Sequence, residues 1–555
     1  MNQFPLPEIE IKLLSSLDKV FPDELPVYRP ECMKLTALKG ETISFQAACL
    51  AHSDFLKTRA DVKITSPLAD YIQIRSVENV PAGRVCNPIT DDNYLKTTSG
   101  IYPDLLKELE NATVDIYPGR WRSLWIDIEI KEDTPAGTFP ITLTLSREGQ
   151  ILGNASTSIS VYDVVLPPQK LIHTEWMHTD CLADYYHVPV FSEDYWKILE
   201  NFLREYTKRG CNMILTPLFT PPLDTAVGTE RTTVQLIKVN REKDCFQFDF
   251  SLLKRWIDLC QKCGIKYFEM SHLFSQWGAK YPPKVIVTEN GQETKLFGWH
   301  TPDSEEYISF LRCFLPLLTS KLKEWGISDV TYFHLSDEPA PGDLEGYRRA
   351  REAVGPLLNG FHTIDALSSY EFYRHGLIDK PIPGNNEIHE FLEHGLTRMW
   401  TYYCVLQSYE VSNRFMAMPS LRNRIFGLQL YKYDIEGILH WGYNFYNSQF
   451  SLEHLNPYQV TDAGGAFPSG DAFLVYPGAN GHPEESIRIM VLQEALNDLR
   501  SCQLLESLTS RDYVIELIEE DLSEPLTFRM FPKSDMYLLQ LRNRINREIA
   551  KRAGV

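Results

Sequence analysis

Two adjacent carboxylates offer the clearest chemistry in this sequence. They lie in the segment His334-Leu335-Ser336-Asp337-Glu338-Pro339, after a short apolar run that predicts a β-strand. Two like charges this close raise the pKa of one partner, so one carboxyl group can hold a proton while the other stays ionised. Such a pair can protonate a leaving oxygen and stabilise the positive anomeric centre of a sugar. The alternative is that Asp337, Glu338 and Pro339 only form the acidic first turn of a helix.

Eight short apolar runs, separated by amphipathic helical segments, must position this pair. The alternation predicts an α/β fold in which residues 168–510 form a (β/α)8 TIM barrel, the catalytic domain. A helix over 484–507 is expected to close the barrel. The expected strands are 173–178, 212–216, 266–272, 330–336, 360–364, 380–383, 399–404 and 437–443.

The two ends of the chain have different patterns. Residues 1–167 alternate β-type runs with Pro, Gly, Asn and Asp turns, which predicts an N-terminal β-sandwich domain. Leu166-Pro167-Pro168 marks its end. Residues 511–555 are expected to form a C-terminal helical extension packed on the barrel.

The expected seventh strand and its loop contain no obvious nucleophile. The run MWTYYCVLQSY, residues 399–409, has no carboxylate before Glu410. Without an enzymic nucleophile, hydrolysis can recruit the 2-acetamido group of an N-acetylhexosamine. Asp337 would then orient the amide N–H and stabilise an oxazolinium intermediate, while Glu338 would act as general acid and then as general base.

Seven segments carry a resemblance to a known family. They are 176–196, 214–225, 231–236, 267–283, 297–307, 333–339 and 438–447, together with WIDIEIKEDTPAGTFP in the expected sandwich. On these segments the sequence resembles glycoside hydrolase family 123. The resemblance implies a retaining exo-β-N-acetylgalactosaminidase with an N-terminal β-sandwich and a (β/α)8 barrel. It also implies that Asp337 polarises the acetamido group and that Glu338 is the acid/base.

The expected substrate contacts lie near the carboxyl ends of the strands, where barrel enzymes place their active sites. Aromatic faces suit the apolar face of a sugar ring, and polar side chains suit its hydroxyl groups. Tyr402 or Tyr443 could donate its hydroxyl to the acetamido oxygen. Each residue could instead serve packing. The candidates are Trp176, His178, Asp180, Glu269, His272, Trp277, His334, Trp400, Tyr402, Trp441, Tyr443 and Asn444.

The charge of the chain narrows the classes of molecule that it is expected to bind. The chain has 555 residues, with 55 Lys+Arg against 74 Asp+Glu and a net charge of −19, which disfavours nucleic acid and anionic membranes. We expect no cofactor and no metal. His389 and His394 are five residues apart and diverge by about 140° on a helix, which excludes a zinc-protease helix. The expected partner is a carbohydrate, a GalNAc-containing glycan or glycolipid.

Other readings stay open. The N-terminus lacks a signal-peptide pattern, which predicts a cytoplasmic protein, or a secreted one if a leader was trimmed. A barrel glycosidase of other specificity, such as a β-N-acetylglucosaminidase or an enzyme for a non-acetamido sugar, could use the same residues. So could a carbohydrate-binding protein without catalytic activity. The sequence does not indicate the oligomeric state.

Overall fold

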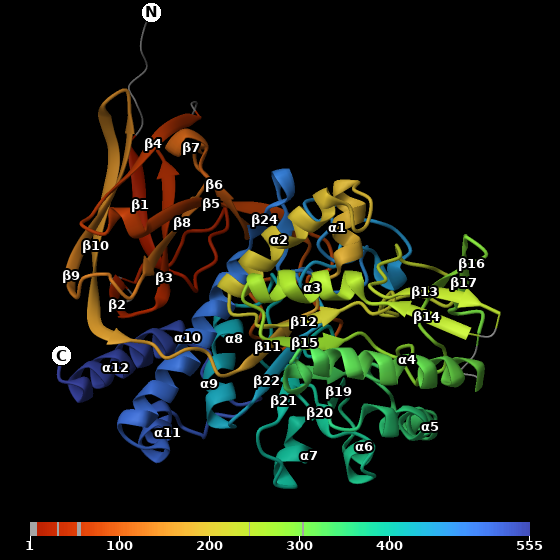
Figure 1. Ribbon diagram of the computed structural model, residues 1–555. Helices are drawn as coiled ribbons and strands as arrows, with labels where there is room; N and C mark the ends of the chain where they lie inside the picture. Colours follow the sequence, from red (N-terminus) through yellow and green to blue (C-terminus); the bar gives the residue numbers. More distant parts are fainter. Residues whose placement is uncertain (1–7, 30–32, 53–56, 244, 302–304) are drawn as a thin grey trace, which may run out of the picture. The chain divides into compact units, whose positions relative to one another are not determined.

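The computed structural model describes residues 8–29, 33–52, 57–243, 245–301 and 305–555 (Figure 1). The N-terminal residues 1–7, and residues 302–304 of the segment 297–307, lie outside the described residues. The chain divides into two compact units. The first comprises 1–169, 408–433 and 484–555, and the second comprises 170–407 and 434–483.

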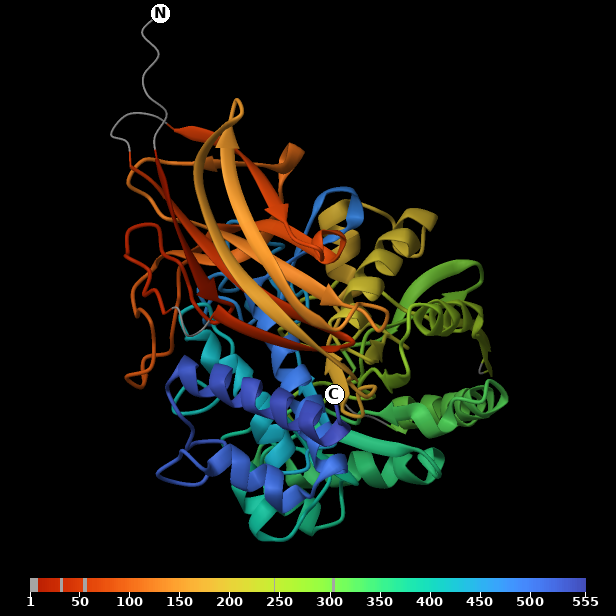
Figure 2. The same ribbon diagram turned by 90° about the vertical axis from the view of Figure 1, so that its left-hand side faces the viewer.

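The first unit contains two five-stranded sheets, in the orders β1-β3-β8-β5-β6 and β2-β10-β9-β4-β7. Alternating apolar side chains of both sheets enter one core, for example Leu124, Ile126 and Ile128 of one sheet and Ile141 and Leu143 of the other. The long curved strands β9 and β10 are the orange pair in Figure 2. The strands are β1 (Ile9–Ser15), β2 (Lys34–Lys39), β3 (Glu41–Ala51), β4 (Thr58–Thr65), β5 (Ile72–Ala82), β6 (Gly100–Glu108), β7 (Thr113–Ile116), β8 (Arg122–Ile130), β9 (Gly137–Arg147) and β10 (Gln150–Val165).

Helices complete the first unit. The helix α10, expected to close the barrel, contacts α8, α9, α11 and α12 and the strands β3 and β6. The helix α12, expected to lie on the barrel, contacts α10, β2 and β10. Both helices belong to the first unit, and α10 is buried around most of its circumference. The helices are α8 (Ser420–Arg424), α9 (Phe426–Lys432), α10 (Ile487–Leu508), α11 (Arg511–Glu519) and α12 (Asp535–Ala553).

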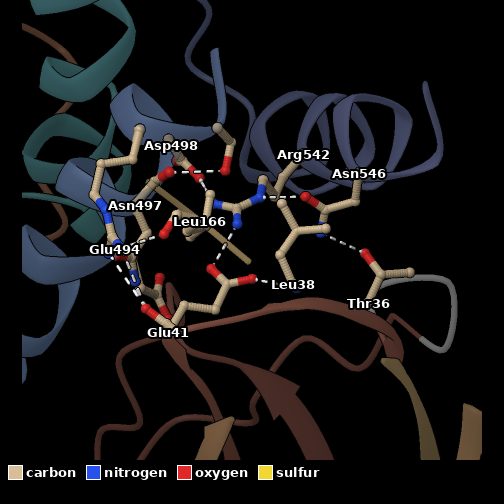
Figure 3. A network of polar contacts seen from close by, with 12 residues as sticks. Thr36, Leu38, Glu41, Leu166, Glu494, Asn497, Asp498, Arg542 and Asn546 are labelled. Atoms are coloured by element: carbon tan, nitrogen blue, oxygen red, sulfur yellow. Dashed lines mark hydrogen bonds and ion pairs between the residues drawn. The ribbon is translucent and has the colours of Figure 1, made fainter. Parts of the chain in front are cut away.

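A buried ionic network fixes α12 within this unit (Figure 3). Arg542 donates to Asp498 Oδ1 at 2.8 Å and to Glu41 Oε2 at 2.5 Å. Its Nε donates to Asn546 Oδ1 at 2.9 Å, and Asn546 in turn donates to Thr36 Oγ1 at 3.0 Å. The network therefore connects α12 with α10 and with the strands β2 and β3.

The second unit contains the eight parallel strands that the sequence predicts, in the order β20-β19-β18-β15-β12-β11-β22-β21. The two end strands meet at a bridge between Gly384 and Tyr402, where Asn385 N donates to Tyr402 O at 2.8 Å. The sheet is thus a nearly closed barrel. The strands are β11 (Ile172–Glu175), β12 (Met213–Thr216), β15 (Tyr267–Met270), β18 (Thr331–Phe333), β19 (His362–Ala366), β20 (Lys380–Ile382), β21 (Trp400–Tyr402) and β22 (Gly437–His440).

Amphipathic helices connect these strands. Figure 1 shows α2, α3 and α4 beside the strands β11, β12 and β15. The turn after α3 needs Gly264, which has φ +99°, as expected for the glycine that ends such a helix. The helices are α1 (Thr179–Tyr186), α2 (Glu193–Lys208), α3 (Ser251–Lys262), α4 (Glu305–Glu324), α5 (Leu344–Val354), α6 (Tyr370–Arg374) and α7 (Ile388–Glu393). No described helix is both long enough and apolar enough to cross a membrane.

A four-stranded sheet that the sequence did not reveal is inserted among the barrel loops. Its order is β14-β13-β16-β17. It arises from two hairpins, one after β12 and one after β15. Its strands are β13 (Lys238–Glu242), β14 (Cys245–Asp249), β16 (Val285–Glu289) and β17 (Gln292–Phe297).

Candidate active site

The acidic pair lies at the carboxyl end of β18, the fourth barrel strand. Asp337 is buried, with 4% of its surface exposed, and Glu338 is half-buried. Glu338 has φ +44°, and its backbone N–H donates to Ala366 O at 2.9 Å, which anchors the loop to the end of β19. The helix α5 begins only at Leu344, with Asp343 before it. The pair therefore does not cap a helix, and the capping alternative is excluded.

Side chains from two other parts of the barrel donate hydrogen bonds to the pair. Gln276 Nε2 donates to Asp337 Oδ2 at 2.7 Å, and the Tyr402 hydroxyl donates to Glu338 Oε1 at 3.0 Å. The other Asp337 oxygen, Oδ1, is buried and has no hydrogen-bond partner among the described residues. An unpaired buried acceptor is costly, so Oδ1 is suited to receive a donor from a ligand.

Burial raises the pKa of both acids. For Asp337 burial acts first and the negative charge of Glu338 second, and together they hold its pKa well above the usual range. For Glu338 burial again dominates, the hydrogen bonds from Tyr402 and Trp277 oppose it, and the charge of Asp471 adds to it. One proton can therefore remain on this pair at a pH where ordinary carboxyl groups are ionised.

A charged layer lies beneath the pair. His334 Nε2 lies 2.9 Å from Glu269 Oε2 and its Nδ1 lies 3.1 Å from Asp365 Oδ1, and all three side chains are fully buried. Burial alone would lower the pKa of His334, but these two hydrogen bonds outweigh it and raise the pKa to about 9. His334 is thus an imidazolium between two carboxylates, and its positive charge lowers the pKa of Asp337.

His272 and Trp176, which the sequence predicts as substrate contacts, are buried and pack against this layer. The His272 ring stacks on that of His334 at 4.2 Å, and Trp176 meets both rings edge-on and donates from Nε1 to Glu269 Oε2 at 3.2 Å. His272, His334 and Asp365 place potential ligand atoms within 4.8 Å of one another. Both nitrogens of His334 lie within hydrogen-bond distance of a carboxylate, Glu269 on one side and Asp365 on the other.

A second buried cluster connects the ends of β11 and β22. Arg231 forms two hydrogen bonds of 2.7 Å with the carboxylate of Asp180 and donates to His178 Nδ1 at 2.9 Å. His178 Nε2 donates to Trp441 O at 2.7 Å, and Asn444 bonds both the N–H and the C=O of His178. Burial, then the charge of Arg231, lower the pKa of His178 to about 3, so His178 is neutral. The polar groups named in this cluster therefore form hydrogen bonds with one another.

The predicted aromatic contacts separate into two groups. Trp277 is 42% exposed and Trp441 is half-buried, so both can meet a ligand. Trp400 is fully buried at the first residue of β21, where it contacts Tyr332 in the barrel core. Tyr443 is fully buried against Tyr206 of α2, at a centroid distance of 4.9 Å. Trp400 and Tyr443, two of the candidate substrate contacts, thus fill space within the fold.

Tyr402 also differs from its expected role. Its hydroxyl proton points to Glu338, which leaves it committed to the acid rather than to an acetamido oxygen. Tyr402, the last residue of the seventh barrel strand β21, therefore orients the Glu338 side chain.

Sequence reasoning missed three residues of this site. Gln276 has no charge to mark it, Arg231 lies in a loop 15 residues beyond β12, and Asp471 follows Trp441 by 30 residues in a Gly-rich loop. Asp471 is fully buried, accepts from Trp441 Nε1 at 2.9 Å and acts on Glu338 through its charge. Only the folded loops bring Gln276 and Asp471 to the acidic pair and Arg231 to Asp180 and His178.

The fold and the site together define a class. A nearly closed barrel of eight parallel strands, with a coupled acidic pair after the fourth, is the arrangement of a barrel glycoside hydrolase. The family model for the glycoside hydrolase 123 catalytic domain matches residues 176–505. The chain therefore belongs to glycoside hydrolase family 123, and it is a glycosidase.

One of the solved structures compared with this chain shares its fold. A family 123 glycoside hydrolase from Clostridium perfringens, studied for glycolipid glycan hydrolysis, has a TM-score of 0.72 at 17% identity over 98% of both chains. A Bacteroides ovatus GH5 xyloglucanase reaches a TM-score of 0.31 at 8% identity, over 84% of this chain and 99% of its own. A Rhizomucor miehei family 5 mannosidase reaches 0.32 at 10%, over 67% and 97%. The last two are too dissimilar to inform the site. No protein with a curated description matches this sequence.

Proposed function

We propose that this protein is a retaining exo-β-N-acetylgalactosaminidase that uses the 2-acetamido group of its substrate as the nucleophile. The observation that carries the proposal is Oδ1 of Asp337, a buried acceptor without a partner among the described residues, beside the half-buried acid Glu338. An acetamido N–H would satisfy this acceptor. The overall frame would be a (β/α)8 barrel with an N-terminal β-sandwich.

The reaction would proceed in two steps. The acetamido oxygen attacks the anomeric carbon while the bond to the leaving oxygen breaks, and Glu338 gives its proton to that oxygen. Asp337 stabilises the positive oxazolinium ring that forms. Glu338 then takes a proton from water, which attacks the anomeric carbon and reopens the ring. Two inversions give net retention.

The electrostatics suggest where the proton of the pair lies. In the free enzyme the pair can hold one proton, because burial raises the pKa of both acids and the charge of Glu338 raises that of Asp337 further. A hydrogen bond from a substrate amide favours the ionised form of Asp337. Binding would therefore leave the proton on Glu338, the residue that must donate it.

The substrate is proposed to be a glycan with a terminal β-linked N-acetylgalactosamine, a glycolipid included. The Clostridium perfringens relative supports this choice through its described action on glycolipid glycans. Trp277 and Trp441 offer the exposed aromatic surface that a sugar ring requires.

Release of an aryl aglycone tests this proposal. The wild-type protein and Asp337→Asn are compared on β-GalNAc, β-GlcNAc and β-galactoside substrates. We expect turnover of the GalNAc substrate, loss of it in Asp337→Asn, and no turnover of the plain galactoside. Preference for the GlcNAc substrate would instead identify a β-N-acetylglucosaminidase.

One observation favours a second candidate. Asp471 is a buried carboxylate that acts on Glu338 through its charge, so it could serve as an enzymic nucleophile in a conventional retaining glycosidase. That enzyme would cleave sugars without an acetamido group. Hydrolysis of the plain β-galactoside, lost in Asp471→Asn, would select this candidate.

A further inference from the structure

The loop after β15 holds the acidic pair through two consecutive residues. Gln276 donates from Nε2 to Asp337 Oδ2 at 2.7 Å, and the backbone N–H of Trp277 donates to Asp337 O at 2.9 Å. The Trp277 side chain also forms a hydrogen bond with Glu338. The dipeptide Gln276-Trp277 therefore contacts both Asp337 and Glu338.

We propose that Gln276 is a positioning residue that occupies Oδ2 of Asp337 and thereby leaves Oδ1 as the oxygen that receives the substrate amide. The inference rests on the proposed function for the identity of that amide. The contact between Gln276 and Asp337 does not depend on it.

The orientation of the Gln276 amide is fixed by its other contact. The backbone N–H of Asp224 donates to Gln276 Oε1 at 3.0 Å, so this atom must be the acceptor oxygen. The NH2 group consequently faces Asp337. A flipped amide would set an oxygen against a carboxylate and an NH2 group against an N–H. Gln276 can therefore act toward Asp337 only as a donor.

The partner of Gln276 is itself held firmly. Asp224 Oδ2 accepts from Phe450 N at 3.1 Å, and Asp224 O accepts from Ser451 Oγ at 2.7 Å. The ring of Phe450 meets that of Trp277 edge-on, with 6.1 Å between centroids. Two loops, after β12 and after β22, thus fix the position of the Gln276 side chain.

The backbone around Gln276 has little freedom. Trp277 has φ +59° and Asp224 has φ +41°, conformations that L-residues keep only when the surroundings impose them. Gly278 has φ +106°, and a Cβ there would come within 2.5 Å of Asp343 Oδ1. The loop is therefore a rigid support for Gln276.

Donation by Gln276 favours the ionised form of Asp337, which orienting an amide N–H requires. Other charged groups act on the same carboxylate. Glu338 on its own loop and Asp365 on β19 raise the pKa of Asp337, whereas His334 lowers it, and the Cys404 thiol after β21 is also near enough to interact. Removal of the Gln276 donor should therefore raise the pKa of Asp337 further.

Two substitutions separate the donor from the shape of the side chain. Gln276→Glu keeps an acceptor for the Asp224 N–H but sets a carboxylate against Asp337, and Gln276→Met removes the donor without adding charge. Gln261→Glu adds the same charge at an exposed position of α3 and serves as the control. Circular dichroism and melting temperature establish that each variant is folded.

The first readout needs no substrate. The protonated carboxyl band of Asp337, identified in infrared spectra by its absence from Asp337→Asn, is titrated with pH in each variant. We expect the band to persist to higher pH in Gln276→Glu and Gln276→Met, and to be unchanged in Gln261→Glu. An unchanged titration in both Gln276 variants would overturn the inference whatever the enzyme hydrolyses.

The second readout depends on the proposed function. Affinity for a thiazoline mimic of the oxazoline, and the acidic limb of kcat/KM against pH, are compared in the same proteins. We expect affinity to fall about 10- to 100-fold in Gln276→Glu, and the acidic limb to move to higher pH. If the wild-type protein neither binds the mimic nor hydrolyses acetamido substrates, the proposed function fails, while the infrared titration still decides the role of Gln276.

Discussion

Glu338 and Asp337 are adjacent in sequence but differ in how the protein holds them. Glu338 is half-buried and receives the Tyr402 hydroxyl, whereas Asp337 is buried and keeps one oxygen without a described partner. In the proposed mechanism, partial exposure would let Glu338 reach the leaving oxygen, and burial would hold Asp337 beneath the sugar ring.

Glu338→Gln tests the role of the acid. Substrates with poor leaving groups should lose about 10²- to 10⁴-fold in turnover, because they depend on protonation. Activated aryl glycosides need little protonation and should lose far less in the glycosylation step. Turnover is measured with both substrate classes. An equal loss for the two would exclude Glu338 as the acid.

Asp471→Asn tests the influence of charge on that acid. Burial first, and the charge of Asp471 among the lesser causes, raise the pKa of Glu338. In the proposed mechanism Glu338 must be protonated to act, so activity should fall as pH rises through its pKa. Without the Asp471 charge this pKa is lower, and the falling limb of the kcat/KM profile should move to lower pH while turnover persists. Complete loss of turnover would instead indicate that Asp471 is the nucleophile.

At the scale of single residues, the sequence predicts the acidic pair but few of the side chains that contact it. Adjacent carboxylates after an apolar run are visible in the sequence alone, which is why Asp337 and Glu338 can be predicted as candidates. The inward or outward direction of Trp400 and Tyr443 depends on packing against Tyr332 and Tyr206. Gln276 and Asp471 come from loops whose paths no local pattern specifies.

At the scale of elements, all eight predicted barrel strands are present in the predicted order. Short apolar runs between amphipathic helices are a strong signal because a parallel strand is buried on both faces. The sequence does not predict the inserted sheet, since strands such as β14 and β17 are short and largely exposed. The place of α10 was also missed, because a helix buried around most of its surface does not reveal its neighbours.

Arg542→Ala tests the attachment of α12. The substitution leaves Glu41 and Asp498 buried without this cation, which should destabilise the first unit by about 3–5 kcal/mol. Arg547→Ala, at an exposed position of the same helix, should change stability by less than about 0.5 kcal/mol. Urea unfolding followed by circular dichroism measures both. Equal midpoints for the two variants would contradict a stabilising role for Arg542.

At the scale of the whole molecule, the described site side chains all belong to the second unit, residues 170–407 and 434–483. The chain returns to the first unit between these two segments and after them. Contiguous domain boundaries read from the sequence could not anticipate this interleaving, because they assume that each domain is one stretch of chain.

Ligand binding should therefore stabilise the second unit. A thiazoline mimic at 100 times its dissociation constant contributes about 2.7 kcal/mol, enough to raise the unfolding temperature of that unit by about 5 °C. Asp337→Asn should show a much smaller rise at the same concentration. Scanning calorimetry measures both proteins. An equal rise in the two would mean that Asp337 does not contact the mimic.

The most direct measurement replaces the acetamido group of an aryl β-GalNAc substrate with mono-, di- and trifluoroacetamido groups. Fluorine withdraws electrons from the carbonyl oxygen and weakens it as a nucleophile, while the size of the group changes little. If that oxygen attacks the anomeric carbon, kcat/KM should fall progressively with each added fluorine. A rate that is unchanged across the series would contradict participation by the substrate and would assign the attack to a side chain of the enzyme.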